Sequence, residues 1–351
     1  MVDAVLIHHY TATLSPRDAV GVHTLALDAL LNELGHETQL FAASIHPELR
    51  GRARDFQDQD RVGTPDLLLY QASTGSPVAD HLLRRPEPLV LNYHNLTPAD
   101  HFDPWEAHVG AELDAGRRQL ARLARRAGHG VADSRYNAEE LAALGMERLW
   151  VAPVLFDPPP LPAQRVTRDP PTLLFVGRLA PNKAQQDLIS MMALLRERRP
   201  GARLILVGTA SSARYETALR TLADTVCPDG VEFVGSVDQA SLIEWYGRAD
   251  AFVCLSEHEG FCVPVIEAMA AGVPVIAFDA AAVPETVGGA GIVLDDKRPA
   301  VVVGAIERVL DDAELREQMM IAGQERARSF GPEAARRQHR DAFEAILGDV
   351  A

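Results

Sequence analysis

Positive charge is scarce in this 351-residue sequence. Acidic side chains number 49 against 34 lysines and arginines, which gives a formal net charge of −15. Only Lys183 and Lys297 are lysines. A nucleic-acid binder needs a basic surface to neutralise phosphates, so this balance excludes that class. It also argues against permanent attachment to anionic lipid.

Cysteine is scarce as well. The three cysteines, Cys227, Cys254 and Cys262, show no spacing typical of a metal site. Cys254 and Cys262 stand in apolar runs, so we expect small buried side chains in a reducing compartment. The N-terminus lacks a basic region followed by a long apolar run, so residues 2–7 predict a first strand instead of a signal peptide. The cytoplasm is the expected location.

The length exceeds what one hydrophobic core usually supports, so two domains are expected. Short apolar runs alternate with helical patterns on both sides of a proline-rich stretch, 153–171. This alternation predicts an α/β protein with two doubly wound, Rossmann-like domains facing across a cleft. The expected ranges are 1–160 for the first domain, 161–330 for the second domain and 331–351 for a last helix that returns to the first domain. The expected strands are 2–7, 38–42, 66–70, 88–93, 130–132 and 149–152, then 172–176, 203–207, 231–234, 251–255, 273–277 and 291–294.

The most informative stretch is SEHEGFCVPVIEAMAAGVPVIA, residues 256–277. Glu267 is the single ionisable group in its apolar part, where an unpartnered carboxylate would cost several kcal/mol. Glu259 precedes it on a glycine-containing loop, and Pro264 marks the start of a helix. A helix N-terminus directs free N–H groups at whatever the loop binds, which suits hydroxyl and phosphate oxygens. Glu259 alone could simply complement the helix dipole, but Glu267 lies one turn further in.

A second stretch, VGRLAPNK, follows the first expected strand of the second half. Gly177 allows a tight turn, and Arg178 and Lys183 place two cations before the next helix. Arginine offers a planar fork and lysine a point charge, so the pair suits a diphosphate. The alternative to a binding role is that these two residues simply form an exposed basic turn. Gly208 and Gly235 also end expected strands, in LVG and FVG.

These motifs together resemble the retaining glycosyltransferases of family four, which have the GT-B fold. The resemblance is close in the second half, where AAAVPETVGGAGIVL and the terminal helices also fit, and loose in the first. It implies a hexosyltransferase that moves a sugar from a nucleotide-diphosphate sugar to a hydroxyl acceptor with retention. The expected donor is a UDP-sugar first and a GDP-sugar second. The acceptor is a small molecule, a glycan or a lipid-linked compound.

The resemblance also implies roles for individual residues. Arg178 and Lys183 would bind the donor diphosphate, Glu267 would accept hydrogen bonds from the ribose, and Glu259 and His94 would contact the donor sugar. Apart from Glu267, these are the expected catalytic residues. The other expected donor-binding positions are Gly21, Gly177, Gly235, Val237, Gly260, Phe261, Cys262 and Val263.

In the mechanism that the resemblance implies, a donor phosphate oxygen takes the acceptor proton on the front face. Arg178 and Lys183 stabilise the departing diphosphate, so no metal or other cofactor is expected. The chain departs from the family pattern at two places. The loop at Gly21 has one glycine where the family has two, and Ala281 and Ala282 replace a glycine pair before Pro284.

Other interpretations stay open at this stage. A sugar-nucleotide epimerase, a sugar phosphorylase and a non-catalytic sugar-nucleotide binding module would all suit the same fold. A dinucleotide-dependent dehydrogenase would need GxGxxG after the first strand, which HHYTATLSPRDAVG does not supply. His8 and His9 are expected to end that strand and face the cleft. The basic helix 117–126 is either a solvated face or a surface for a phosphorylated or membrane-borne acceptor.

Overall fold

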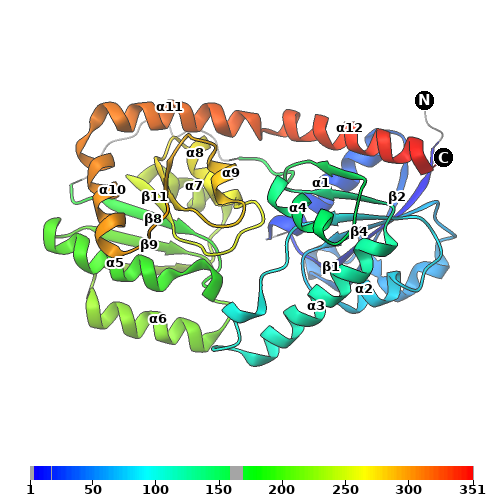
Figure 1. Cartoon of the computed structure of the whole chain (residues 1–351), viewed down its shortest axis with the longest axis horizontal. Helices are drawn as coiled ribbons and strands as arrows, with labels where there is room; N and C mark the ends of the chain where they lie inside the picture. The colour runs from blue at the N-terminus through cyan, green and yellow to red at the C-terminus, as the bar shows by residue number, and fades with distance from the viewer. Residues whose placement is uncertain (1–3, 17, 159–168, 351) are drawn as a thin grey trace. The chain divides into compact units, whose positions relative to one another are not determined.

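The computed structural model of this chain describes residues 4–16, 18–158 and 169–350. The chain divides into two compact units. Unit 1 consists of Met1–Ala99, His108–Asp157 and Gly331–Ala351, and unit 2 consists of Asp100–Ala107 and Pro158–Phe330 (Figure 1). The C-terminal helix therefore groups with unit 1. Residues 100–107 group with unit 2, although the sequence placed them in the first domain. Most of the expected proline-rich linker, 159–168, lies outside the described residues.

Unit 1 contains a seven-stranded parallel sheet in the order β3-β2-β1-β4-β5-β6-β7. Apolar side chains such as Leu69, Val90 and Leu91 bury the central strands completely. The strands are β1 (Leu6–Leu14), β2 (Glu37–Ile45), β3 (Arg54–Asp55), β4 (Leu67–Ala72), β5 (Leu89–Tyr93), β6 (His129–Ala132) and β7 (Leu149–Val151). The helices are α1 (Ala19–Glu33), α2 (Pro77–Leu82), α3 (Ala107–Arg126), α4 (Arg135–Ala143) and α12 (Pro332–Val350).

The first strand is longer than the sequence suggested. β1 pairs with β2 as far as Leu14, so His8 and His9 lie inside the strand and are fully buried. The prediction that they end the strand was wrong. Tyr10, Thr11 and other aromatic or β-branched residues continue the strand beyond the apolar run, because such side chains suit a pleated surface.

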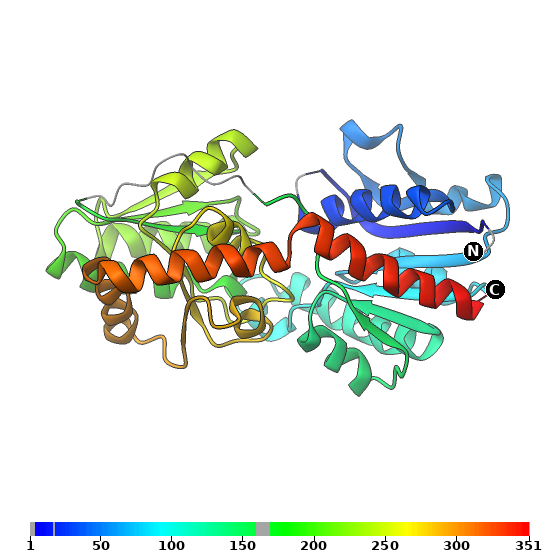
Figure 2. The ribbon, with the colours of Figure 1, turned by 90° about the horizontal axis from the view of Figure 1, so that it is seen from above.

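Helix α12 packs within unit 1. Its Phe343 and Ile346 are fully buried in a core cluster with residues of α1 and β4. His339 is also buried, and its Nε2 lies 2.9 Å from the carbonyl oxygen of Pro153. Figure 2 shows this helix, in red, running along unit 1. Burial lowers the pKa of His339 to about 4.

Unit 2 contains a six-stranded parallel sheet in the order β10-β9-β8-β11-β12-β13. Helices α5 and α6 lie on one face of the sheet, and α8 and α9 lie on the other (Figure 1). The strands are β8 (Thr172–Val176), β9 (Arg203–Val207), β10 (Val231–Gly235), β11 (Ala251–Cys254), β12 (Val275–Phe278) and β13 (Ile292–Leu294). The helices are α5 (Gln185–Arg198), α6 (Ala213–Val226), α7 (Gln239–Arg248), α8 (Val263–Ala270), α9 (Val283–Val287), α10 (Pro299–Asp311) and α11 (Ala313–Ser329).

The segment 100–107, which we name the crossing segment, leaves unit 1 after β5 and packs in unit 2. The Trp105 ring meets the Tyr215 ring edge-on at 4.9 Å between centroids. Glu106 accepts a 2.5 Å hydrogen bond from the hydroxyl of Ser212, the residue that caps α6. A stretch between two elements of unit 1 therefore completes the core of unit 2.

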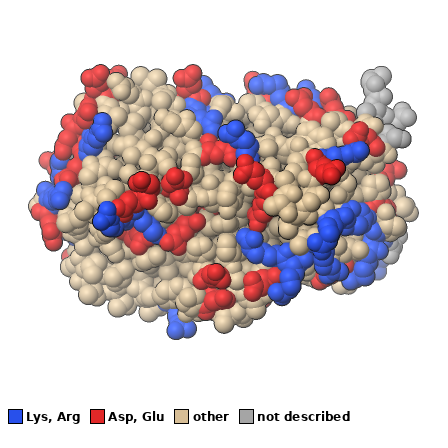
Figure 3. Space-filling view, in the orientation of Figure 1, with Lys and Arg blue, Asp and Glu red and all other residues tan. Residues whose placement is uncertain are grey.

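Arginine side chains gather on α3, where Figure 3 shows a patch of blue. Arg118, Arg122 and Arg125 are exposed. Arg117 is half-buried and pairs with Glu140 at 2.8 Å. Arg126 is also half-buried and donates to the carbonyl of Arg85 at 2.8 Å, and the exposed Arg122 pairs with Asp80 at 3.3 Å. Part of this helix is thus a structural element, and an acceptor-binding role for its exposed arginines stays a prediction. Among the described helices, none combines the length and apolar character that crossing a bilayer requires.

Candidate active site

The candidate site lies in unit 2, where the sheet order reverses between β8 and β11. At such a reversal the chain leaves two neighbouring strands in opposite directions, which opens a ligand-binding crevice beyond their carboxyl ends. The loop after β8 contributes Arg178 and Lys183, and the loop after β11 contributes Glu259. The structure therefore brings two of the expected motifs to one edge of one sheet.

Glycines hold the strand ends in close approach. A Cβ at Gly208 would lie 2.1 Å from the carbonyl oxygen of Gly177, and Gly208 has a φ of +138°. The N–H of Gly208 donates to the carbonyl of Gly235, at 2.8 Å. The expected role of these glycines as ligand contacts stays a prediction, whereas their packing already requires a residue without a side chain at position 208.

Lys183 and Glu259 form a buried ion pair. The Lys183 Nζ lies 2.5 Å from Glu259 Oε2, and the two side chains are 17% and 9% exposed. Burial alone would lower the pKa of Lys183, but the Glu259 carboxylate and the nearby Cys262 raise it above the ordinary value. Lys183 therefore carries its charge, and Glu259 neutralises it in the ligand-free protein.

Two polar side chains fix the loop that carries Lys183. Asn182 donates from Nδ2 to the carbonyl of His258 at 3.0 Å, and the backbone carbonyl of Asn182 accepts from the N–H of Glu257 at 2.8 Å. Gln185 donates from Nε2 to the carbonyl of Arg178 at 2.9 Å. These bonds tie the loop after β8 to the loop after β11, so the Lys183 ammonium and the Glu259 carboxylate are positioned together.

The Arg178 side chain is exposed. Within the described residues, its guanidinium has no carboxylate or carbonyl partner. An exposed guanidinium without an acidic partner among the described residues suits an anionic ligand.

The N-terminus of α8 faces the same loop. Cys262 precedes the helix in the left-handed conformation, with a φ of +67°, and no side chain caps the helix. A non-glycine residue held in this region costs of order 1–3 kcal/mol and such strain clusters at functional sites. The carbonyl of Phe261 accepts a 2.5 Å hydrogen bond from Thr286. Val263 begins the helix and is half-buried.

Among the described residues, the Glu267 carboxylate has one hydrogen-bond partner. The buried Tyr246 hydroxyl, from α7, donates to Glu267 Oε2 at 2.8 Å. Burial raises the pKa of Glu267, and the Tyr246 hydrogen bond partly opposes this. Within the described residues Tyr246 is the single hydrogen-bond partner of this carboxylate, so Oε1 is left to accept from a ligand. Tyr246 thus accounts for one of the two carboxylate oxygens of Glu267 in this apolar helix, and Oε1 is the other.

The two cysteines that flank the Glu259 loop lie close together. Cys254 Sγ is 3.9 Å from Cys262 Sγ and 3.3 Å from the hydroxyl of Ser256. Contact between the thiols lowers the pKa of Cys254 and, together with burial, raises that of Cys262. Both side chains are buried, as the sequence predicted.

A second ionic cluster supports the same loop. Lys297 pairs with Asp187 at 2.6 Å and also with Glu257. His101, on the crossing segment, lies 3.4 Å from the other carboxylate oxygen of Glu257. Both lysines of the chain therefore pair with acids of the loop after β11. Val237, expected near the nucleobase, is half-buried in the loop before α7.

His94 lies at the end of β5 in unit 1, as expected, but both nitrogen atoms of its ring already have partners within the protein. Nδ1 lies 2.9 Å from Asp133 and Nε2 lies 2.5 Å from Gln71 Oε1, and the side chain is 2% exposed. Gln71 also contacts Nε2 of His9 at 2.6 Å. A sugar could bond to His94 only if one of these contacts opened, so the expected sugar contact stays a prediction.

Gly21 is not in a free loop. It stands in the first turn of α1, and its N–H donates to the capping side chain of Asp18 at 2.8 Å. A Cβ at this position would lie 1.8 Å from the carbonyl oxygen of Ser15. The glycine is therefore required by packing, and its N–H group already has an acceptor.

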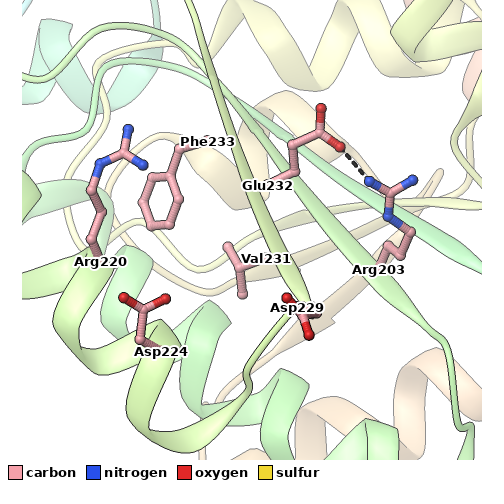
Figure 4. Close-up of a pocket in the computed structure, with 7 residues that line it drawn as sticks. All are labelled: Arg203, Arg220, Asp224, Asp229, Val231, Glu232 and Phe233. Atoms are coloured by element: carbon pink, nitrogen blue, oxygen red, sulfur yellow. Dashed lines mark hydrogen bonds and ion pairs between the residues drawn. The ribbon is translucent and has the colours of Figure 1, made fainter.

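A hollow of about 640 Å³ lies between α6 and the edge strand β10, and Figure 4 shows the side chains that line it. Four of them interact in pairs, because Arg220 lies over the Phe233 ring and Arg203 pairs with Glu232 at 2.5 Å. A smaller hollow of about 310 Å³ adjoins it and reaches Gly235. Both are on the α6 face, so neither contains the ion pair or the α8 carboxylate.

Sequence reasoning missed several residues that position the site: Tyr246, Asn182, Gln185, Asp187, Lys297 and His101. All of them except Gln185, which bonds to the nearby Arg178, act through a partner distant in the chain, and the local pattern does not indicate that partner. The rarity of lysine was the one available signal for Lys297.

Comparison with known proteins agrees with the geometry of unit 2. Residues 162–326 match the family model described as glycosyl transferases group 1. This segment, just under half of the chain, is similar to that family, and we call it the glycosyl transferases group 1 segment. The glycosyl transferases group 1 segment contains both lysines and both site carboxylates.

Curated proteins that resemble the glycosyl transferases group 1 segment share about one third of its residues. A D-inositol 3-phosphate glycosyltransferase of Jonesia denitrificans is 32% identical over 167 residues, which is 45% of this chain and 39% of the relative. A GDP-mannose-dependent alpha-(1-6)-phosphatidylinositol monomannoside mannosyltransferase of Mycobacterium tuberculosis is 35% identical over 165 residues, which is 44% of this chain and 42% of the relative. The chain thus spans about two fifths of the length of these relatives.

Solved structures match both units. HepE of Anabaena, in complex with UDP-glucose, has a TM-score of 0.77 at 17% identity and covers 97% of this chain and 100% of its own. Sucrose-phosphate synthase of Thermosynechococcus elongatus has a TM-score of 0.76 at 17% identity and covers 98% and 99%. At this identity the likeness shows the fold alone. The fold is GT-B, as the sequence predicted.

Proposed function

We propose that this chain is a retaining glycosyltransferase that moves a sugar from a UDP- or GDP-sugar to a hydroxyl acceptor. The observation that carries the proposal is the meeting of the Lys183–Glu259 pair with the uncapped N-terminus of α8 at the sheet reversal. This arrangement offers a cation, an acceptor for sugar hydroxyls and the N–H groups of the turn at Cys262 and Val263, because Pro264 has no N–H and Val265 donates to the carbonyl of Cys262 at 3.0 Å. The similarity of residues 162–326 to the glycosyl transferases group 1 family supports it.

In this proposal the donor lies along the loop after β11. Arg178 and Lys183 bind the diphosphate, and the N–H groups at the start of α8 assist them. Glu267 accepts from the ribose through Oε1, while Tyr246 holds Oε2. When the donor binds, the diphosphate takes Lys183 and frees the Glu259 carboxylate to accept from the sugar.

Sugar transfer then needs charge stabilisation more than a strong base. The bond from the anomeric carbon to the diphosphate oxygen breaks, and Arg178 and Lys183 stabilise the negative charge on the leaving group. A phosphate oxygen takes the proton of the acceptor hydroxyl on the same face, and the new glycosidic bond retains configuration. No resident metal is required in this scheme, since fixed cations neutralise the leaving group.

The test is a screen with UDP-, GDP-, ADP- and TDP-sugars, read by thermal shift and by slow hydrolysis of the donor. We expect one nucleotide class to stabilise the protein and to be hydrolysed. The names of the relatives make inositol phosphates the first acceptors to add. Stabilisation with neither hydrolysis nor transfer would favour the non-catalytic binding module instead, and the absence of any stabilisation would contradict the proposal.

A further inference from the structure

Cys254, Cys262 and Glu259 bring three potential metal ligands together. One ligand atom from each residue lies within 4.8 Å of the other two. Cys254 and Cys262 are eight residues apart, which is not a familiar metal-site spacing, so the sequence alone does not predict this cluster. The strand end and the left-handed turn at Cys262 bring the two sulfur atoms to the same side of the loop.

The sulfur–sulfur distance distinguishes two possible uses of the pair. Two thiolates on a tetrahedral zinc ion, each with a Zn–S bond of about 2.3 Å, are about 3.8 Å apart. A disulfide needs a separation of about 2.0 Å. The observed 3.9 Å already matches shared metal ligation, whereas a disulfide would require nearly 2 Å of movement within packed surroundings.

Charge also favours a divalent cation. Two thiolates and the Glu259 carboxylate carry three negative charges, and the neighbouring Lys183 ammonium carries one positive charge. One divalent ion brings the sum to zero, which matters because uncompensated charge in a buried site is costly. Thiolate ligands select a soft ion such as Zn²⁺ over Mg²⁺ or Ca²⁺, which prefer oxygen.

We propose that Cys254, Cys262 and Glu259 form a binding site for one soft divalent cation of the Zn²⁺ class. Three protein ligands leave the fourth tetrahedral position for water. The ion competes with Lys183 for the Glu259 carboxylate. If the proposed function holds, the bound ion removes a sugar-binding acceptor and acts as an inhibitor of transfer. The binding itself does not depend on that function.

The test uses metal alone and no sugar nucleotide. The reduced, tag-free chain is incubated with Zn²⁺, desalted and analysed for bound metal, and Co²⁺ is then used as a spectroscopic probe. We expect one Zn²⁺ per chain and a sulfur-to-cobalt charge-transfer band. Cys254→Ser and Cys262→Ser should each weaken Zn²⁺ binding at least about 100-fold, because even outer-shell partners are worth 10–100-fold. The matched control, Cys227→Ser, alters the third buried cysteine, at the end of α6, and should leave Zn²⁺ binding unchanged.

Lys183→Gln separates this site from the proposed donor site. Removing a cation that competes for Glu259 should tighten Zn²⁺ binding, whereas the same change should weaken nucleotide binding. No sulfur-to-cobalt band in the native chain would overturn the proposal even if a cysteine variant failed to fold. Equal Zn²⁺ retention by the native chain and by a folded Cys254→Ser, Cys262→Ser double variant would overturn it too.

Discussion

Removing the Tyr246 hydroxyl tests the assignment of Glu267 to the ribose. In Tyr246→Phe, Glu267 Oε2 loses its 2.8 Å hydrogen bond, and the ring can stay in its buried position. A hydrogen bond to a charged acceptor contributes about 1.5–3 kcal/mol. Part of this free energy orients the carboxylate for the ribose. Since each 1.4 kcal/mol is about a factor of ten in affinity, we expect about tenfold weaker nucleotide binding.

The pH dependence gives this experiment its specificity. Ribose hydroxyls donate to the ionised carboxylate, so affinity should fall as the pH drops through the pKa of Glu267, which burial places above the ordinary carboxyl value. Tyr246 opposes that rise because it stabilises the ionised form. In the Phe variant the pKa of Glu267 should rise further. The acid limb of the affinity profile should therefore move to higher pH.

The assay is calorimetric titration of the best nucleotide from the screen across the acidic range, with thermal melting as a check on folding. Tyr215→Phe is the matched control, since this buried tyrosine bonds to the neutral Gln185 and Gln186 on the other face of the sheet. It should leave the acid limb in place. An unshifted limb in Tyr246→Phe, with affinity unchanged, would refute the role of Glu267 as a ribose acceptor.

Three further outcomes are expected. Arg178→Ala combined with Lys183→Gln should lower turnover at least about 100-fold, because each removes a group that stabilises the leaving diphosphate; retained turnover in the folded variant would remove that assignment. Gly21→Ala places a Cβ 1.8 Å from the carbonyl oxygen of Ser15, so the melting temperature should fall by at least about 2 °C, and an unchanged value would contradict the packing argument. Burial raises the pKa of Asp133, so the stability contributed by this carboxyl is present at low pH and lost as the pH rises through that pKa. The melting temperature of Asp133→Asn relative to the native chain should therefore increase as the pH rises above the ordinary carboxyl pKa, and a relative decrease would contradict the dominance of burial.

Much of the fold was predictable because each buried parallel strand is a short apolar run. The expected strand 203–207 coincides with β9, and 172–176 coincides with β8. The first strand was harder to predict. His8 and His9 interrupt its apolar run, and the strand continues to Leu14, where aromatic and β-branched residues pair with β2.

The candidate site was predictable where function requires unusual residues in one stretch. Glu267 in an apolar helix and two cations after a strand are visible in the chain. The partners of these groups were not visible. Tyr246 reaches Glu267 from another helix, and the Lys183–Glu259 pair joins residues 76 positions apart. Such contacts depend on how the strands are ordered, so only the folded chain reveals them.

The crossing segment changes how this protein can be dissected. A gene fragment that encodes residues 158–330 would omit Trp105, strip the Tyr215 ring of its edge-on neighbour and leave the Ser212 cap without Glu106. A fragment of unit 1 that keeps 100–107 would in turn carry an unpaired tryptophan-bearing loop. Independent expression of unit 2 therefore requires that the 100–107 peptide be added, by a linker or in trans, and a chimera with another GT-B protein should exchange that peptide together with unit 2.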